Sequence, residues 1–555
     1  MIGVVFKERQ QVTVREFFQL FKVPFEKYIN GKHYDVIITT EDFEIGNCLP
    51  KLLIVSKNGS SIFDSKHHIG LSEKKTGVLL SGNRYKVPIY GNVTTIKSSG
   101  VPILEAIGEK IIGGVMIEGG GQKIIRIGYD IFDEIEFLLK IGQGIENAQI
   151  PTLENHISLL REWILDAGVP IVEIPPIPQG YDFIACLTHD IDFFGIKDHK
   201  FDHTFFGFLY RSLSPFGGSG KKTSFKNYRK NLRALMSLPG VYSGLTPDFW
   251  YPLDRYSEIE KGLKSTFYFI PYKDHPGLLP TAELPKYRAA RYEVRRYVNQ
   301  IRELINNGHE VGVHGLDAWC DTDKGIDESE VIRGITGDIK TGIRMHWLYF
   351  DTDSPAKLEK AGYYYDTTLG YNDAIGYRSG TTQVFRFLDT SNLFELPLHI
   401  QDTAMMFPKR MGLSDAEALE RCREIVNDME KYGGALTINW HDRSLAPERN
   451  WDGLYMELLQ LLKDKKVWFA TAMETVSWFE RRRNIVFHSV VFRDGRIRWK
   501  ISGAEKKDMP GHIVRIHYPL KHRPKGEPST SNDFCTYRDI SLFGNSEFDE
   551  AIPTG

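Results

Sequence analysis

The sequence predicts an α/β protein built around a central β/α barrel. Short apolar segments alternate with helical segments from Tyr181 to about Arg481, four of the apolar segments end in titratable residues, and the two flanking regions follow different patterns. The chain has 555 residues, which is too many for a single hydrophobic core. We therefore expect an N-terminal α/β domain (1–178), the barrel (179–481) and a small C-terminal β-rich domain (482–555).

The N-terminal region combines short strands with two helical segments, Ile131–Ile141 and Leu153–Ala167, in which apolar residues recur at helical spacing. The glycine run Gly119–Gly121 matches no established phosphate-binding pattern, so a tight turn is favoured over a phosphate loop. A proline-rich linker, Ile174–Gly180, ends the region. The expected strands are Ile2–Phe6, Asp35–Thr39, Lys51–Val55, Val78–Ser81, Lys86–Tyr90, Gly114–Ile117 and Ile124–Gly128.

The central and C-terminal regions differ in their patterns. Strand–helix alternation favours a closed or nearly closed barrel, whereas the tail after Arg482 contains mainly strands and turns. The expected barrel strands are Phe183–Leu187, Ser265–Ile270, Glu310–His314, Met345–Tyr349, Leu393–Leu398, Ala435–Asn439 and Val467–Ala470, with helices such as Arg291–Asn307, Ser354–Ala361, Ser414–Tyr432 and Leu454–Lys463 between them. The expected tail strands are Ile485–Phe492, Arg496–Ile501 and His512–His517.

The composition is that of an ordinary globular protein, with 41% hydrophobic and 26% charged residues. A formal net charge of −2 argues against a general nucleic-acid binder. The five cysteines are scattered and form no C-x-x-C pair, which indicates a reducing compartment. The N-terminus resembles no signal peptide, and no apolar run has the roughly 18 residues that a membrane span needs. We expect a cytoplasmic protein.

Asp190 and Asp192 follow a short apolar run, where an α/β barrel places its chemistry. Alternate residues of an extended chain point the same way, so both carboxylates can face one site. One could hold a cation and the other could act as a base on a water bound to that cation. A strand cap or turn is the alternative interpretation of such a pair.

Two further strand ends carry candidate ligands and partners. His314 ends the segment Glu310–His314, and an imidazole together with a carboxylate suits Zn²⁺ or a similar divalent ion. His309 precedes that strand, at the opposite end of the barrel, and is expected to be structural. Arg344 and His346 alternate with one intervening residue, so both can face the same side. An arginine beside a catalytic Asp would keep the carboxylate ionised, although a surface ion pair is an equal alternative.

His441 follows the buried segment Ala435–Asn439. Histidine is the side chain whose pKa best suits proton donation near neutral pH, although a single His at a strand end is commonly structural. Four strands that all end in titratable groups together favour a metal-assisted hydrolytic site.

Four motifs in this order resemble those of polysaccharide deacetylases with a NodB-homology domain, as in carbohydrate esterase family 4. They are Thr188-His-Asp-Ile-Asp192, Gly308-His-Glu-Val-Gly-Val-His314, Arg344-Met-His346 and Ile438-Asn-Trp-His441, and Leu358–Asp366 resembles the segment after the arginine motif. The resemblance covers roughly residues 181–480 and leaves both termini uncovered. It implies a distorted (β/α)7 barrel and metal-dependent removal of acyl groups, usually acetyl, from amino sugars.

Carried over residue by residue, the resemblance implies that Asp190 is the general base, Asp192 and His314 are metal ligands, and Arg344 holds Asp190 charged. His441 would protonate the departing amine. The metal would be divalent, with zinc favoured, and would polarise the amide carbonyl. The usual Asp-Asp pair is split here by Ile191.

The third ligand departs from the family pattern. The second motif normally supplies another His four residues after the first, and here Ala318 occupies that position. Asp317 and His346 are the two candidate replacements, with His346 favoured because it stands where the arginine motif usually has Pro. An inactive carbohydrate-binding barrel without metal is the alternative.

The segment 203–247 breaks the barrel pattern because it contains no Asp or Glu. Its basic residues are interleaved with aromatic ones. This pattern favours a solvated basic helix, and the alternative is an interfacial patch that docks on anionic lipid or on a phosphorylated sugar carrier. The basic residues are Arg211, Lys221, Lys222, Lys226, Arg229, Lys230 and Arg233.

Three functional hypotheses follow. The leading one is N-deacylation of an amino sugar in a polysaccharide, glycolipid or sugar-linked precursor, with a carbohydrate as the partner. The second hypothesis is a deformylase or other amidase that acts on a lipid-linked sugar and contacts the membrane peripherally through 203–247. A non-catalytic glycan-binding protein is the third.

Overall fold

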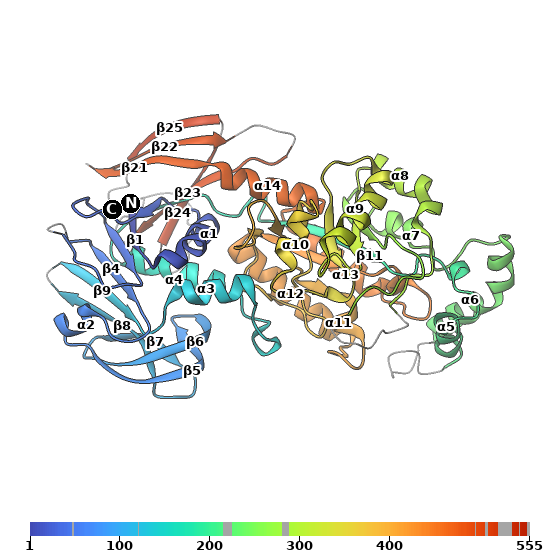
Figure 1. The fold of residues 1–555 in the computed structure, drawn as a ribbon, viewed down its shortest axis with the longest axis horizontal. Helices are drawn as coiled ribbons and strands as arrows, with labels where there is room; N and C mark the ends of the chain where they lie inside the picture. The colour runs from blue at the N-terminus through green and yellow to red at the C-terminus, as the bar shows by residue number, and fades with distance from the viewer. Residues whose placement is uncertain are drawn as a thin grey trace. The chain divides into compact units, whose positions relative to one another are not determined.

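The computed structural model describes residues 1–46, 49–119, 121–214, 225–279, 288–493, 495–504, 509–519, 535–542 and 544–551. The chain divides into two compact units: Met1–Gly180, Ser379–Thr381 and Trp478–Gly555 form the first, and Tyr181–Arg378 with Thr382–Ser477 forms the second. The expected three-domain division stays a prediction. Figure 1 shows the course of the chain.

The first unit contains a nine-stranded mixed sheet in the order β2-β1-β3-β4-β9-β8-β7-β5-β6. The strands from β2 to β9 in this order run parallel, and the remainder pair antiparallel as hairpins. The parallel strands are buried runs of Val, Ile and Leu, as expected for strands covered on both faces. The bounds are β1 Ile2–Val5, β2 Phe25–Lys27, β3 Val36–Thr39, β4 Leu52–Ser56, β5 Gly70–Gly82, β6 Tyr85–Lys97, β7 Val101–Ala106, β8 Ile112–Gly119 and β9 Gln122–Ile127.

Four helices accompany this sheet: α1 Gln11–Phe21, α2 Ile62–Lys66, α3 Ile131–Lys140 and α4 Thr152–Asp166. The two helices expected from the sequence are confirmed within one residue at each end. Asp130 caps α3 by accepting hydrogen bonds from the backbone N–H groups of Phe132 and Asp133. Gly119 and Gly121 flank the turn that joins β8 to β9, and Gly121 has a φ of +79°. Residue 120 lies outside the described residues.

The first unit also contains two small antiparallel sheets, β10-β23-β24 and β21-β22-β25, and the tail of the chain supplies every strand of them except β10. Trp499, Ile501 and Ile516 are among the residues of their shared core. The expected strand-rich tail is confirmed. The bounds are β10 Ile171–Glu173, β21 Val486–Arg493, β22 Arg496–Ala504, β23 Ile513–Pro519, β24 Cys535–Ser541 and β25 Gly544–Ala551.

The second unit is the expected α/β barrel. Its strands follow the order β16-β17-β15-β14-β13-β12-β11-β19-β18, with β20 also paired to β11, and every pairing except β16 with β17 is parallel. The sheet curls without hydrogen bonds joining β16 to β18, so it forms a distorted, open barrel. The bounds are β11 Phe183–Ile191, β12 Ser265–Phe269, β13 Glu310–Gly315, β14 Gly342–Met345, β15 Tyr365–Asp366, β16 Phe385–Arg386, β17 Phe394–Glu395, β18 Ile400–Gln401, β19 Ala435–Asn439 and β20 Val467–Phe469.

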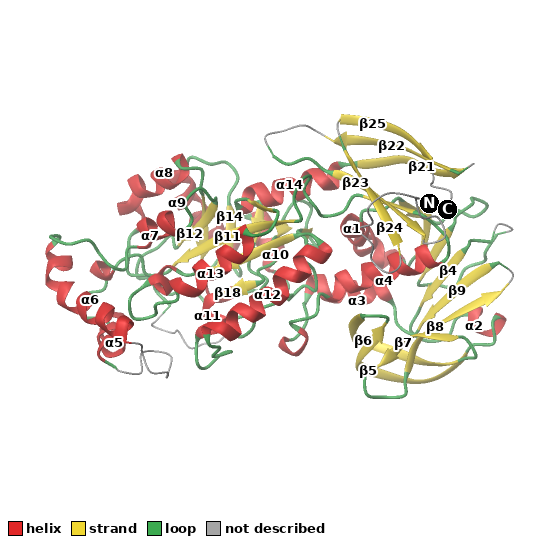
Figure 2. Cartoon of the chain, turned by 180° about the vertical axis from the view of Figure 1, so that it is seen from behind, coloured by secondary structure: helices red, strands yellow, loops and turns green. Residues whose placement is uncertain are grey.

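Most of the helices of this part of the chain lie around these strands, whereas α5 and α6 project away from them (Figures 1 and 2). They are α5 His203–Leu213, α6 Phe225–Ser243, α7 Pro252–Ile259, α8 Val298–Asn306, α9 Thr322–Thr336, α10 Ser354–Lys360, α11 Asp402–Met406, α12 Asp415–Tyr432, α13 Asp452–Lys463 and α14 Ala472–Asn484. Both α5 and α6 fall in the basic segment 203–247, whose Lys221 and Lys222 lie outside the described residues. Within the described ranges, no helix combines the length and apolar character of a bilayer span.

Two expected strands are corrected. The strand predicted at Met345–Tyr349 is wrong, because β14 ends at Met345 and the chain then turns through Trp347 and Leu348, whose φ angles are +66° and +55°. The strand predicted at Leu393–Leu398 shortens to β17, two residues long. In both places aromatic and apolar residues favour extended chain, but burial in tertiary structure satisfies them without a long strand.

Candidate active site

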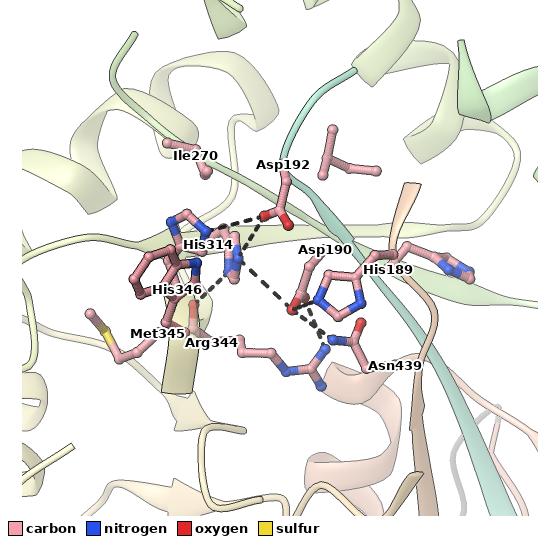
Figure 3. Close-up of polar contacts among 12 residues, drawn as sticks. His189, Asp190, Asp192, Ile270, His314, Arg344, Met345, His346 and Asn439 are labelled. Carbon is pink, nitrogen blue, oxygen red and sulfur yellow. Dashed lines mark hydrogen bonds and ion pairs between the residues drawn. The ribbon is translucent and has the colours of Figure 1, made fainter. Parts of the chain in front are cut away.

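The carboxyl ends of β11, β13, β14 and β19 bring the predicted residues together (Figure 3). Parallel strands end at one edge of a sheet, so residues distant in sequence meet there. Asp190 and Asp192 point to this edge, whereas His189 points away (Figure 3). Nε2 of His189 instead lies 2.9 Å from Oε1 of Glu260. The alternation of side chains along β11 therefore separates a structural histidine from two site carboxylates.

Asp190 is buried and held on both carboxylate oxygens. Nη1 of Arg344 donates to Oδ1 at 3.0 Å, and Nδ2 of Asn439 donates to Oδ2 at 2.7 Å. Burial alone would raise the pKa of Asp190, but the nearby Arg344 guanidinium, and after it the imidazoles of His314 and His441, outweigh burial and lower this pKa to about 2. Asp190 is therefore a carboxylate across the physiological pH range.

Asp192, His314 and His346 place one ligand atom each within 4.8 Å of one another. Oδ1 of Asp192 lies 3.3 Å from Nε2 of His314 and 3.5 Å from Nε2 of His346. Figure 3 shows both imidazoles facing this carboxylate. Two imidazoles and one carboxylate leave further coordination positions open, as catalytic zinc sites do.

The protonation of these groups fits a bound cation. Nδ1 of His314 lies 2.9 Å from the carbonyl oxygen of Arg344, which only accepts, so Nδ1 is the donor and Nε2 is the ring nitrogen available to a cation. Burial, and next the nearby His314, lowers the pKa of His346 well below its ordinary value, which keeps that ring neutral. Oδ1 of Asp192 is buried and accepts no hydrogen bond within the described residues. Lone pairs that converge in this way need a cation between them, so the donor set fits a divalent metal ion.

Asp317, the other candidate third ligand, is engaged elsewhere. Its Oδ2 lies 3.0 Å from Nε2 of His275 and 3.2 Å from Nζ of Lys324, and its Oδ1 accepts from the backbone N–H of Leu278. The geometry thus favours His346 as the third ligand. The turn at Trp347, a non-glycine residue with positive φ, orients the chain immediately after His346.

Arg344 is fully buried, and each of its three guanidinium nitrogens donates to an acceptor of the barrel. Besides Asp190, it donates to Oγ1 of Thr188 at 2.7 Å and to the carbonyl and hydroxyl oxygens of Thr367 at 3.1 and 3.2 Å. The guanidinium carbon also lies 4.8 Å from the ring centre of Tyr268. A surface ion pair, the alternative considered for Arg344, is therefore wrong.

His441 lies at the same edge, with Nε2 3.9 Å from Oδ2 of Asp190. Its Nδ1 lies 2.6 Å from Oδ1 of Asp402, and its backbone N–H donates to Oδ2 of Asp402 at 2.8 Å. Burial alone would lower the pKa of His441, but Asp402 outweighs burial and raises this pKa to about 9. The ring is an imidazolium at neutral pH, with Nε2 directed at the site.

Asp190, Asp192, His314, His346 and His441 line a cavity of about 190 Å³ in the second unit. Its wall adds aromatic and basic side chains that the sequence analysis did not single out, among them Phe193, Trp347, Phe407, Arg410 and Arg449. The volume accommodates a small acyl group and part of a sugar ring.

Sequence reasoning missed two residues that hold the site. Asp402 follows β18, a strand of two residues that is too short to show a pattern. Asn439 lies inside a quoted motif, but nothing in the sequence indicates that its amide holds Asp190. A carboxylate at a strand end is the signal that could have found Asp402.

Comparison with known proteins found no matching family model. A peptidoglycan deacetylase of Helicobacter pylori is 29% identical over 94 residues, which is 16% of this chain and 32% of that protein. Over this stretch the chain is similar to a polysaccharide deacetylase. The chain thus matches about a third of that relative's length. The resemblance to polysaccharide deacetylases that the motifs predicted is confirmed.

Solved structures that align with this chain include carbohydrate deacetylases. The carbohydrate deacetylase Agd3 aligns over 100% of this chain and 98% of its own, with 10% identity and a TM-score of 0.40. A family 4 carbohydrate esterase from Streptomyces lividans, in complex with acetate, aligns over 53% and 93%, with 12% identity and a TM-score of 0.23. A family 4 pseudoenzyme from Bacillus anthracis aligns over 54% and 66%, with 10% identity and a TM-score of 0.25.

Proposed function

We propose that this protein is a metal-dependent hydrolase that removes an N-acyl group, with acetyl favoured, from an amino sugar in a polysaccharide, glycolipid or sugar-linked precursor. The observation that carries the proposal is the placement of three functions at one edge. Asp190 is held ionised, Asp192 converges with His314 and His346, and the His441 imidazolium faces them.

The side chains suggest a division of labour. A divalent ion held by Asp192, His314 and His346, with zinc favoured, would polarise the amide carbonyl and lower the pKa of a water molecule. Asp190 takes the proton from the attacking water, and Arg344 with Asn439 keeps its carboxylate oriented. His441 gives its Nε2 proton to the departing amine, and Asp402 stabilises the charged ring until then.

A mass-spectrometric screen for acyl loss tests the proposal. N-acetylated glycans and sugar-linked precursors are incubated with the protein before and after treatment with a chelator, and then after zinc is restored. Acyl loss that stops with the chelator and returns with the metal supports the proposal. A protein that binds glycans but releases no acyl group with zinc or another divalent ion supports the non-catalytic alternative instead.

A lipid-linked sugar is the second candidate substrate, because the surface of α5 and α6 carries exposed apolar side chains next to basic ones. Phe206, Tyr210 and Met236 are 54%, 73% and 67% exposed. Arg229 and Arg233 of α6 are also exposed, and segment 203–247 contains no acid. Exposed aromatic and basic side chains together suit the interface of an anionic membrane.

Flotation with vesicles that contain anionic lipid tests this second candidate. The double variant F206S/Y210S should abolish flotation, whereas M456S, which replaces an exposed residue of α13, should not. No flotation of the wild type removes the reason to prefer a lipid carrier. The five scattered cysteines suggest a reducing, cytoplasmic compartment for either substrate.

A further inference from the structure

Two arginines on the wall of the active-site cavity flank the same aromatic ring. The guanidinium carbons of Arg410 and Arg449 lie 5.5 Å and 5.1 Å from the ring centre of Phe407, and all three residues line the cavity together with Asp190, Asp192 and His441. Two positive charges beside one ring repel each other, and an anion bound between them would offset that repulsion.

Arg449 has no anionic partner within the described residues. Its guanidinium makes no hydrogen bond or ion pair there, and its other contact is the ring of Trp451, 5.3 Å away. The nearby carboxylate of Glu448 is already paired with Nε of Arg443 at 3.0 Å. Burial, and next the charge of Arg443, lowers the pKa of Arg449 to about 9. The charged guanidinium is therefore poorly stabilised by its surroundings.

Arg410 is only weakly neutralised. Its Nη1 donates to Oγ1 of Thr403 at 2.9 Å, and its Nε lies 3.6 Å from Oδ1 of Asp373, whose side chain is 60% exposed. An ion pair of that length on an exposed carboxylate contributes little. Burial lowers the pKa of Arg410 as well.

A third arginine of the cavity wall, Arg288, serves as an internal comparison. Its Nη1 donates to the carbonyl oxygen of Pro276, and its Nη2 donates to the carbonyl oxygens of Leu316 and His346, at 2.7, 3.1 and 3.0 Å. Those bonds assign Arg288 to loop architecture. Arg410 and Arg449 have no comparable set of acceptors, so their donors remain available to a ligand.

The carboxylates of the cavity cannot neutralise this pair. Asp190 is bonded to Arg344, and Asp402 is bonded to His441. Asp192 converges with the two metal-ligand histidines. Asp190, Asp192 and Asp402 are each engaged in this way, and the basic side chains Arg410 and Arg449 of the cavity wall are not paired with them.

We propose that Arg410 and Arg449 bind an acidic group of the substrate, a phosphate or a carboxylate, next to the sugar that carries the acyl group. This inference rests on the proposed function and defines its substrate class. Guanidinium groups form strong, directional hydrogen bonds with such groups. A phosphate ester on the sugar, the phosphate of a lipid carrier and the carboxylate of a neighbouring acidic sugar would each supply the same chemistry.

Calorimetric binding of matched probes tests the inference without relying on turnover. N-Acetylglucosamine 1-phosphate and the neutral methyl glycoside of N-acetylglucosamine are titrated into the zinc-loaded protein. We expect the phosphorylated sugar to bind at least about 10-fold more tightly, an advantage that falls as salt increases. Equal affinity of the wild type for both probes would overturn the inference, and this comparison needs no variant.

Three variants assign the anion preference to the two arginines. R410Q and R449Q should each reduce the ratio of the two affinities at least about 5-fold, and R449K should retain more of the ratio than R449Q. R421Q, on helix α12 where Arg421 pairs with Glu424, should keep the wild-type ratio. An unchanged ratio in both R410Q and R449Q would contradict the assignment.

Further arms identify the source of the acid and keep the two proposals apart. Competition by a polyprenyl phosphate in micelles, or by a glycan containing a uronic acid, shows which acidic group binds best. Tight binding of the phosphorylated sugar without acyl loss from any substrate would overturn the proposed function and leave this inference intact. Efficient deacylation with equal preference for neutral and acidic substrates would do the reverse.

Discussion

His441 and Asp402 form a two-point contact in which Nδ1 lies 2.6 Å from Oδ1 and the His441 backbone N–H donates to Oδ2 at 2.8 Å. The contact fixes the ring, directs Nε2 at the cavity and keeps the imidazolium charged. Asp402 thus acts through His441 as a positioning residue, and its removal should change the pH at which the site works.

D402N should move the alkaline limb of the pH–rate profile to lower pH. The pKa of His441 is raised from 6.5 to about 9, so a step that needs the imidazolium persists up to about pH 9 and declines above it. Without the carboxylate, burial lowers the pKa, and we expect the limb to fall by about 2 units or more. Profiles of kcat/KM from pH 5 to 10 measure the shift, because they report the pKa values of the free enzyme.

The same pair affects stability in a defined pH window. Because the folded pKa is raised, its stabilising contribution is complete below pH 6.5 and is lost as pH rises through about 9. Urea unfolding of D402N should show less loss of stability across that window than the wild type. D415N, at the start of α12, is the control for unfolding. If D402N leaves the alkaline limb of the pH–rate profile unmoved, Asp402 does not set the pKa of His441.

D190N should abolish turnover and retain the metal. The amide cannot accept the proton of the attacking water, and general-base catalysis contributes about 10²–10⁴-fold to a rate. Asp190 lies outside the converging ligand set, so the metal content measured by mass spectrometry should match the wild type. D182N, just before the opposite end of β11, should keep normal rates. Near-normal deacylation by D190N would show that the base is wrongly assigned.

H314A and H346A should each lose bound zinc, whereas H309A should not. His309 lies immediately before β13, at the opposite end of the strand from His314. H309A is therefore the control, because it also replaces a histidine of this strand by alanine but lies away from the site. Losing one of three protein ligands should weaken zinc binding at least about 10-fold. Equilibrium dialysis measures the affinity, and the same affinity in H346A as in wild type would shift attention back to Asp317.

R344M should destabilise the barrel and make catalysis more sensitive to acid. It leaves Asp190 without its buried cation, which costs about 3–5 kcal/mol of unfolding free energy. The pKa of Asp190, lowered to about 2 mainly by Arg344, should rise, so the acid limb moves to higher pH. R344K keeps the charge and should shift the limb less. Urea unfolding measures the stability, and pH–rate profiles measure the acid limb. If R344M matched the wild type in both, Arg344 would not be the residue that keeps Asp190 charged.

Much of the site could be predicted from the sequence because its residues follow recognisable buried strands. Asp190, His314 and His441 each lie at or just after the end of an apolar run, and parallel strands bring such ends together. Asp402 could not be found in this way, because β18 has only two residues. Asn439 acts through a tertiary contact with Asp190 that no local pattern records.

The turn after β14 shows a second limit of sequence reasoning. The aromatic and apolar residues from Met345 to Tyr349 favour a strand, yet Trp347 adopts a positive φ that such residues rarely take. Local propensity is overridden here by the burial of His346 beside His314. The chain thus departs from its expected strand at His346, which is also the position where this sequence departs from the arginine motif of the family.

Acyl release with controlled metal content tests the central claim most directly. Wild-type protein, its chelator-treated form and the zinc-restored form are incubated with N-acetylated amino-sugar glycans and sugar phosphates, and the loss of acyl groups is followed by mass spectrometry. The account predicts release by the wild type, loss of activity with the chelator, and recovery with zinc in the wild type but not in H314A. Undiminished release without metal, or no release from any substrate with metal bound, would contradict it.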